Sequence, residues 1–170
     1  MNDFTIIENK KKTIIYCDGA ASMKCVNGEY IRGNGGAAFI LIDNNEIIYE
    51  EKKHFNQTTN NFCELYAIYM ALKYFHNNFL NSDCLKIYCD SAYCVNMLKP
   101  GGWVYGWVKN DWTRGKKHEP IENIEIIKEI YNYLEKNKNI EFIKVKGHSG
   151  EKDWNDYVDK LAVKAKMGVK

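Results

Sequence analysis

Residues 87–92 read Ile-Tyr-Cys-Asp-Ser-Ala, an apolar run that ends on a carboxylate and is followed by small residues. Nearly the same six residues occur at 15–20, as Ile-Tyr-Cys-Asp-Gly-Ala. Both stretches are typical of buried strands that deliver an aspartate at the carboxyl end, Asp18 in one and Asp90 in the other. In open α/β sheets, ligands bind in the crevice outside the carboxyl ends of the strands. We therefore expect the functional site to be built around these two acids.

The size and composition of the chain restrict its class. A length of 170 residues predicts a single domain over 1–170, with its core at about 13–166. The composition, 45% hydrophobic and 27% charged, is typical of a soluble globular protein. The net charge of +2 is too small to indicate nucleic-acid binding, so such an activity must depend on a local cluster of cations. No stretch has the roughly 18 uncharged apolar residues of a membrane helix, and the N-terminus lacks the apolar core of a signal peptide.

The cysteines indicate the redox environment. None of the six forms a Cys-x-x-Cys pair, and three lie inside apolar strand or helix patterns, where a free thiol behaves as a small hydrophobe. This pattern favours buried, reduced thiols over disulfides or a zinc site. Reduced thiols are typical of intracellular proteins, so we expect a cytoplasmic location and no membrane partner.

The hydrophobic periodicity predicts elements in the order βββαβαααβα, with a basic segment counted as helical. We expect strands at 13–18, 35–43, 46–53, 85–90 and 140–145. We expect helices that start at Asn60 or Asn61 and at 91–98, 121–136 and 154–166. Residues 22–34, rich in Gly and Asn, are expected to form an unusually long loop. The fold class is therefore α/β, with an antiparallel meander followed by two strands parallel to the first, which sets Asp18 and Asp90 at one edge.

Each of these acids also has a purely structural interpretation. Asp90 before Ser-Ala-Tyr is a good helix N-cap, and Asp18 before Gly19 could be a turn residue. Glu64 could belong to a capping box with Asn61. However, Glu64 lies at the head of the buried stripe of its helix, four residues before Ile68, and the sequence offers no obvious cation as its partner. A metal ion is the simplest partner for a carboxylate placed there.

Two further residues are ambiguous on spacing alone. Asp159 lies on the flank of the core face of the last helix, where an exposed acid would be unremarkable. His148 is a lone histidine in a loop, and such residues are usually solvated. It does follow the end of a strand, however, and therefore opens onto the same edge as the two aspartates.

Several separated motifs together resemble type 1 ribonuclease H. They occur in the family's order over about 13–165, nearly the whole chain. The motifs are Tyr-Cys-Asp-Gly at 16–19, Thr-Thr-Asn-Asn-Phe-Cys-Glu-Leu at 58–65, Tyr-Cys-Asp-Ser at 88–91, Val-Lys-Gly-His-Ser-Gly at 145–150, and then Asn155 and Val-Asp-Lys-Leu-Ala at 158–162. Only this resemblance makes Asp159 and His148 expected site residues.

The resemblance implies a ribonuclease H-like fold with a mixed five-stranded sheet flanked by helices. It implies two Mg²⁺ ions, with Mn²⁺ as a substitute, held by Asp18, Glu64, Asp90 and Asp159. Oxygen-only ligation is what these ions prefer. The implied reaction is endonucleolytic hydrolysis of the RNA strand of an RNA–DNA hybrid, leaving 5′-phosphate and 3′-hydroxyl ends. His148 matches a mobile-loop histidine that assists proton transfer or product release.

The substrate is expected to contact two regions. Asn60, Asn61 and the backbone near Gly19 could donate to sugar and phosphate groups and so read the 2′-hydroxyl. The basic segment, residues 103–119, contains three tryptophans and resembles the basic protrusion of many bacterial and eukaryotic members. Its expected phosphate contacts come from Lys109, Arg114, Lys116 and Lys117. Trp103 and Trp107 share a helix face and are also expected to contact the substrate, with core packing as the alternative.

The chain departs from the family's pattern at two points. The turn after the first aspartate is usually short and rich in Gly and Pro, but here it runs from Ala20 to Asn34. The loop from His148 to Asp159 is about one residue longer than usual. No separate hybrid-binding module is visible, and we expect an active monomer without an obligate protein partner. The alternatives are a domain detached from a reverse transcriptase and a hybrid-binding module that has lost catalysis.

Overall fold

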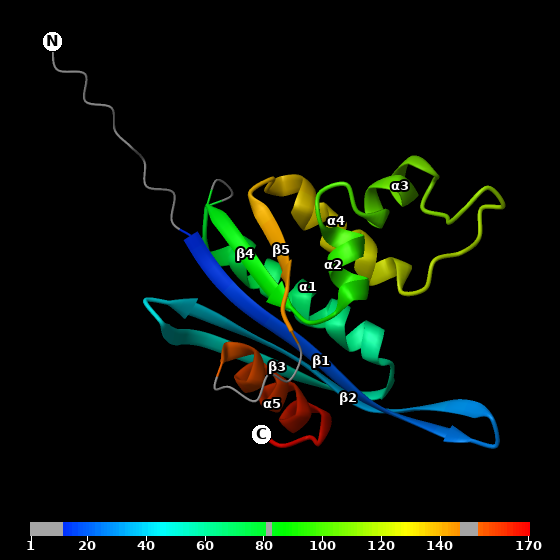
Figure 1. Cartoon of the computed structure of the whole chain (residues 1–170), viewed down its shortest axis with the longest axis horizontal. Coiled ribbons are helices and arrows are strands. Elements are labelled where there is room, and N and C mark those ends of the chain that lie inside the picture. The colour runs from blue at the N-terminus through cyan, green and yellow to red at the C-terminus, as the bar shows by residue number, and fades with distance from the viewer. Residues whose placement is uncertain (1–11, 81–82, 147–152) are drawn as a thin grey trace, which may run out of the picture.

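Five strands form one mixed sheet in the order β3-β2-β1-β4-β5 (Figure 1). The computed structural model describes residues 12–80, 83–146 and 153–170. Strands β1 and β3 run antiparallel to β2, whereas β4 is parallel to both β1 and β5. The predicted mixed five-stranded α/β fold is confirmed. The strands are β1 (Lys12–Val26), β2 (Glu29–Asp43), β3 (Glu46–Thr58), β4 (Cys84–Cys89) and β5 (Ile140–Lys144).

Helices cover both faces of the sheet, and α5 lies on the face opposite α1 (Figure 1). The larger hydrophobic core lies on the α1 side, and a smaller one lies between the sheet and α5. Within the described ranges, no helix is both long and apolar enough to cross a membrane. The helices are α1 (Asn60–Asn78), α2 (Ala92–Leu98), α3 (Trp103–Lys109), α4 (Ile124–Lys136) and α5 (Trp154–Lys166).

Strand β1 supplies both cores because its side chains alternate between the two faces of the sheet. Ile15 and Cys17 are fully buried in the larger core, and Ile14 and Tyr16 pack against the smaller one. The same alternation directs Asp18 away from the α1 core at the point where the neighbouring strand β4 ends. The two cores thus hold β1 rigidly just before its carboxylate.

The predicted long loop at 22–34 is wrong. Strands β1 and β2 continue as a two-stranded hairpin to the turn Asn27-Gly28, which projects from the body of the molecule (Figure 1). Both turn residues have positive φ, 52° and 80°, as a tight type I′ hairpin turn requires. We call residues 22–34 the arm. Strand β3 is also longer than predicted, because it pairs with β2 as far as Thr58.

The basic segment is helical only in its first half. Helix α3 ends at Lys109, and the remainder is irregular, with one short antiparallel bridge between Arg114 and Glu119. The following helix α4 begins at Ile124, three residues later than predicted, after Asn123 in a left-handed conformation (φ 60°). The segment is therefore a short helix followed by an ordered loop.

Candidate active site

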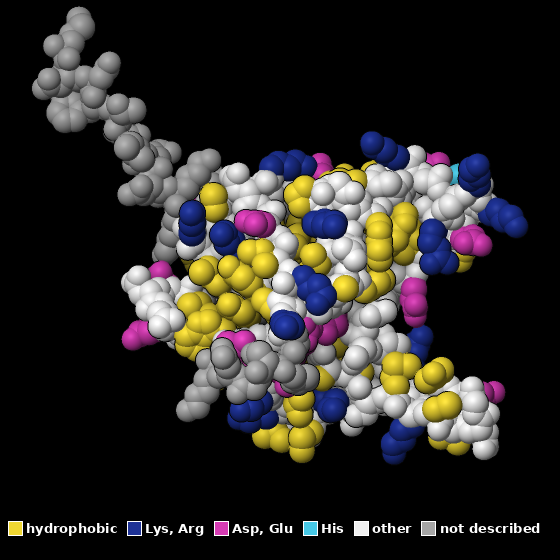
Figure 2. Space-filling model, viewed as in Figure 1, with side chains coloured by type: hydrophobic (Ala, Val, Ile, Leu, Met, Phe, Trp, Pro, Cys, Tyr) yellow, Lys and Arg dark blue, Asp and Glu magenta, His cyan; other side chains and the backbone are white. Residues whose placement is uncertain are grey.

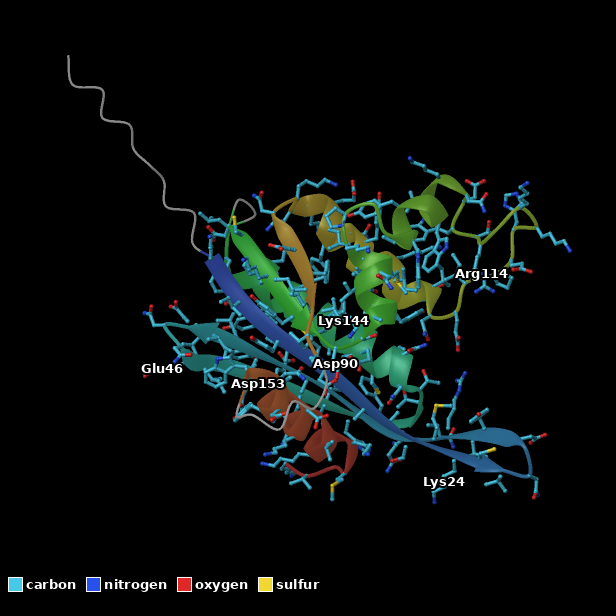
Figure 3. All side chains as sticks on the ribbon, in the orientation of Figure 1. Lys24, Glu46, Asp90, Arg114, Lys144 and Asp153 are labelled. Carbon is cyan, nitrogen blue, oxygen red and sulfur yellow. The ribbon has the colours of Figure 1, made fainter. Side chains whose placement is uncertain are left out.

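Two neighbouring parallel strands bring Asp18 and Asp90 together. The register pairs Tyr16 of β1 with Tyr88 of β4, so the two aspartates lie two positions further along at matching levels. Strand β4 ends at Cys89, whereas β1 continues past Asp18. The opening beside β1 therefore begins at Asp90, which Figure 3 shows near the centre of the molecule.

Helix α1 places Glu64 over this opening. The helix is capped by Thr59, whose hydroxyl accepts a hydrogen bond from the Phe62 N–H at 3.2 Å. The capping-box interpretation of Glu64 with Asn61 is therefore wrong, and Glu64 lies in the second turn, only 8% exposed. The cap interpretation of Asp90 is also wrong, because the Ser91 hydroxyl caps α2 by accepting from Cys94 N–H. Neither acid is needed to start its helix.

Three of the four predicted carboxylates form one cluster. Ligand oxygens of Asp18, Glu64 and Asp90 all lie within 4.8 Å of one another. Asp159 belongs to α5, on the face of the sheet opposite α1, and it lies close enough to Asp18 to raise the pKa of that carboxyl group. All four acids line one surface hollow, and a group of acidic side chains is visible near the centre of Figure 2.

Burial and the neighbouring acids make Asp18 and Glu64 difficult to ionise. Asp18 is only 3% exposed, and its burial, the charge of Asp90 and the contact with Asp159 together raise its pKa to about 8. Burial also raises the pKa of Glu64 well above its ordinary value, with further contributions from the charges of Asp18 and Asp90. The Gly19 N–H donates to Asp18 Oδ1 at 2.9 Å, which opposes the shift without cancelling it. The cluster therefore favours a nearby positive charge.

No protein cation supplies that charge in the described part of the chain, where none of the four acids takes part in a salt bridge. Glu64 Oε2 is buried, and no described residue forms a hydrogen bond with it. Within the described residues, the group of possible ligand atoms that lie within 4.8 Å of one another contains carboxylate oxygens and no cysteine sulfur. An oxygen-only donor set with an unpartnered buried oxygen fits a hard divalent cation such as Mg²⁺ or Mn²⁺.

Comparisons with known proteins agree with this geometry. The RNase H family model matches residues 10–167. A Ribonuclease H of Clostridium botulinum (strain Hall) is 38% identical over 161 residues, which cover 91% of this chain and 95% of that protein. The chain belongs to the RNase H family. The resemblance seen in the sequence motifs is thereby confirmed.

Solved structures of RNase H proteins share the fold. The chain is similar to LC9-RNase H1, a type 1 RNase H with the type 2 active-site motif, with a TM-score of 0.76 at 24% identity, covering 94% of this chain and 74% of that one. It is also similar to LC11-RNase H1 in complex with an RNA/DNA hybrid, with a TM-score of 0.62 at 19% identity, covering 92% of this chain and 97% of that one. At these identities the likeness is one of fold.

Other predicted site residues of this RNase H chain lie around the same hollow. Gly19, Asn60 and Asn61 line it. Asn60 Oδ1 accepts a hydrogen bond from the Ala21 N–H at 2.7 Å, which ties the start of α1 to β1 and leaves the amide NH₂ group as a donor. His148 lies outside the described residues. The roles of all these residues in catalysis or binding stay predictions.

The basic segment presents its cations to solvent, and its aromatic residues divide between packing and exposure. Trp107 packs against the larger core, whereas Trp103 is 46% exposed and has its ring centroid 6.3 Å from that of Trp107. The four side chains predicted to contact phosphates are all exposed: Lys109, Arg114, Lys116 and Lys117. Figure 3 labels Arg114. Trp107 therefore contributes to packing and Trp103 remains accessible to a ligand, while a substrate contact by either residue stays a prediction.

Three residues that line the hollow were not singled out from the sequence: Ala20, Ala21 and Ser91. The signal that could have found them is their position, since each lies one to three residues after a site aspartate in the sequence. Ser91 both caps α2 and contributes to the wall next to Asp90. Small side chains at these positions keep the carboxylates accessible to a large ligand.

Gly19→Ala should destabilise the fold and disturb the site together. A Cβ at this position would lie 2.3 Å from Glu64 N and 2.4 Å from the Cys63 carbonyl carbon, so β1 and the start of α1 would have to separate. Overpacking of this kind costs about 1–3 kcal/mol or more, and urea denaturation measures it. The matched control is Gly106→Ala in α3, where a Cβ meets nothing within 4 Å. An equal loss of stability in both variants would show that the contact with α1 is unimportant.

Proposed function

We propose that this chain is an endonuclease that hydrolyses the RNA strand of RNA–DNA hybrids and leaves 5′-phosphate and 3′-hydroxyl ends. One observation carries the proposal: the ligand oxygens of Asp18, Glu64 and Asp90 converge within 4.8 Å at the ends of two parallel strands in a chain of the RNase H family. Such a cluster has no structural use in the described part of the molecule, because Thr59 and Ser91 cap the adjacent helices.

Two Mg²⁺ ions, with Mn²⁺ as a substitute, are the proposed cofactors. Asp18, Glu64, Asp90 and Asp159 would hold them, and four carboxylates match the formal charge of two divalent ions. When bound, such ions lower the pKa of the attacking water and stabilise charge on the leaving oxygen. The contribution of the chain is to hold its acids fixed and close together, and the bound ions would favour their ionised form. The rigid ends of β1 and β4 and the first turns of α1 provide this positioning.

Discrimination between RNA and DNA requires donors or acceptors for the 2′-hydroxyl. Asn60 and Asn61 lie at the start of α1 beside the carboxylates and line the same hollow as Gly19. We propose that these residues contact the sugars and phosphates next to the cut. His148 would assist proton transfer or product release from its loop.

Exchanging Lys116 and Lys117 for alanine should weaken hybrid binding and flatten its salt dependence. Both side chains are exposed in the basic segment, where they could neutralise phosphates. Each lost phosphate contact reduces the magnitude of the slope of log K against log salt by about 0.9. The slope of the double variant should therefore be smaller by about 2. Fluorescence anisotropy at several salt concentrations measures this slope. A slope equal to that of the unsubstituted chain would exclude the basic segment from the binding surface.

The substrate itself is tested by incubating the chain with labelled RNA–DNA hybrid, double-stranded RNA and double-stranded DNA. We expect Mg²⁺-dependent cutting of RNA in the hybrid alone, and no cutting when EDTA is present. Equal cutting of double-stranded DNA, or cutting that survives EDTA, would reject the proposal. Binding of the hybrid without any cutting would support a catalytically silent module.

The same assay separates an independent enzyme from a domain that depends on a reverse transcriptase. The basic segment is part of this chain, so we propose that the isolated chain is active as a monomer. Sedimentation at the assay concentration tests the monomer. A chain that cuts only after addition of a polymerase partner would instead fit the detached domain. A cytoplasmic location is proposed from the free cysteines alone.

A further inference from the structure

The arm extends the molecule well beyond its carboxylates. Strand β1 continues eight residues past Asp18 before it ends at Val26, and β2 returns from Glu29. Asn60 holds the base of the arm through its bond to the Ala21 N–H. Four large hydrophobic side chains of the arm are exposed: Tyr30, at 75%, and Met23, Val26 and Ile31. Figure 2 shows hydrophobic side chains beside cations on the projecting hairpin.

A second hollow lies between the arm and the end of α5. Three cations line it: Lys24 and Arg32 from the two strands of the arm and Lys166 from the helix. Its other lining residues are uncharged, namely Ser22, Ile31, Gly33, Asn34 and Met167. We call this hollow the cradle. Figure 3 shows Lys24 on the projecting hairpin, apart from Asp90.

The charges of the cradle are not neutralised within the protein. In the described ranges, none of its three cations takes part in a salt bridge. Like charges gathered in one hollow repel one another and raise the local positive potential. An anion is therefore the ligand that this hollow favours. The neighbouring exposed aromatic and aliphatic groups suit a ligand with flat or apolar parts as well as charge.

The position of the cradle indicates which anion it binds. Ala20 and Ala21 line the carboxylate hollow, and Ser22 and Lys24 of the same strand line the cradle. Lys24 is six residues beyond Asp18, which is about 20 Å along an extended strand. A single phosphate cannot reach both places, but a nucleic-acid strand can. At a rise of about 3.4 Å per nucleotide, the two are about six nucleotides apart.

We propose that the cradle binds the phosphate backbone of the nucleic acid beyond the cut site, so that the arm extends the footprint of the enzyme on long hybrids. This inference rests on the proposed function, because it takes an RNA–DNA hybrid to be the ligand of the carboxylate hollow. The arm and the end of α5 act as two walls that hold the duplex. Short hybrids do not reach the cradle and are bound by the carboxylate hollow and the basic segment alone.

The test compares two charge-matched double variants on two hybrid lengths. Lys24→Ala/Lys166→Ala removes one cation from each wall of the cradle, and Lys73→Ala/Lys136→Ala removes two exposed lysines of α1 and α4 outside it. Binding in EDTA is measured by anisotropy with hybrids of about 8 and about 24 base pairs, since the shorter extends only about four nucleotides to either side. We expect the cradle variant to lose affinity for the long hybrid, with a salt slope lower by about 2, and to match the unsubstituted chain on the short one.

Other outcomes would overturn the proposal. These are unchanged binding of the long hybrid, an equal loss on both lengths, or an equal loss in the control variant. A concentration-dependent dimer that the cradle substitutions dissociate would assign the arm to self-association instead. Failure of the proposed function gives a different result. The chain would then still bind long hybrids through the cradle, but it would cut no hybrid in the presence of Mg²⁺.

Discussion

Exchanging Asp90 for asparagine should reduce hybrid cleavage more than about 100-fold while leaving the fold and hybrid binding largely intact. Loss of a residue that only orients a metal ligand costs about 10–100-fold, so loss of a ligand should cost more. The fold should survive because Ser91, not Asp90, caps α2, and because Asp90 is only partly buried. Single-turnover cleavage with Mg²⁺ measures the rate, and anisotropy in EDTA measures binding.

The matched control for this variant is Asp156→Asn. Asp156 lies in the first turn of α5 and does not line the carboxylate hollow, so cleavage should change little. Cleavage by Asp90→Asn within tenfold of the unsubstituted rate would contradict the assignment. Unfolding of that variant would instead mean that Asp90 is chiefly structural.

Exchanging Asp18 for asparagine should stabilise the metal-free protein at neutral and basic pH although it removes activity. Burial and the neighbouring acids raise the pKa of Asp18 from 3.8 to about 8 in the folded state. The folded state therefore binds this proton more tightly than the unfolded state does. The resulting stabilisation of the folded state is fully present below pH 3.8, the ordinary pKa, and is lost as pH rises through about 8, the pKa in the folded state. The unsubstituted protein in EDTA should therefore melt at a progressively lower temperature across this range, by on the order of 10 °C in total.

The variant should show a flatter dependence, because an amide carries no charge at any of these pH values. Addition of Mg²⁺ at pH 8 should raise the melting temperature of the unsubstituted chain and have much less effect on Asp18→Asn. Differential scanning calorimetry from pH 5 to pH 8 provides both results. A melting temperature that does not fall with pH in EDTA, or an equal fall in the variant, would show that the carboxylates do not strain the fold.

Much of the fold could be predicted because its signals are local. The apolar runs before Asp18 and Asp90, and the helical stripe that begins near Glu64, gave the correct element order. The arm was missed although its signal was present: Asn27-Gly28 is a favoured hairpin turn, flanked by residues that accept strand conformation. The Gly and Asn residues of 22–34 indicated a loop. In the structure they form a tight turn and allow the two strands of the arm to approach closely.

The carboxylate site could be predicted only in part from the residues themselves. Asp18 and Asp90 follow from two matching strand ends, and Glu64 from its place at the head of a buried stripe. Asp159 could not be found this way, because it lies on the flank of α5, which covers the face of the sheet opposite α1 and Glu64. The residues that cap α1 and α2 could not be predicted either. Thr59 and Ser91 are the N-caps, although Asn61 and Asp90 have side chains equally suited to that position.

Anomalous diffraction from crystals of the chain with Mn²⁺ and an RNA–DNA hybrid tests the central claim most directly. The account predicts two manganese peaks about 3.5–4 Å apart, surrounded by Asp18, Glu64, Asp90 and Asp159, with an RNA phosphate beside them. Absence of manganese from this cluster in crystals that contain the hybrid, or manganese bound only at other acids of the chain, would contradict it.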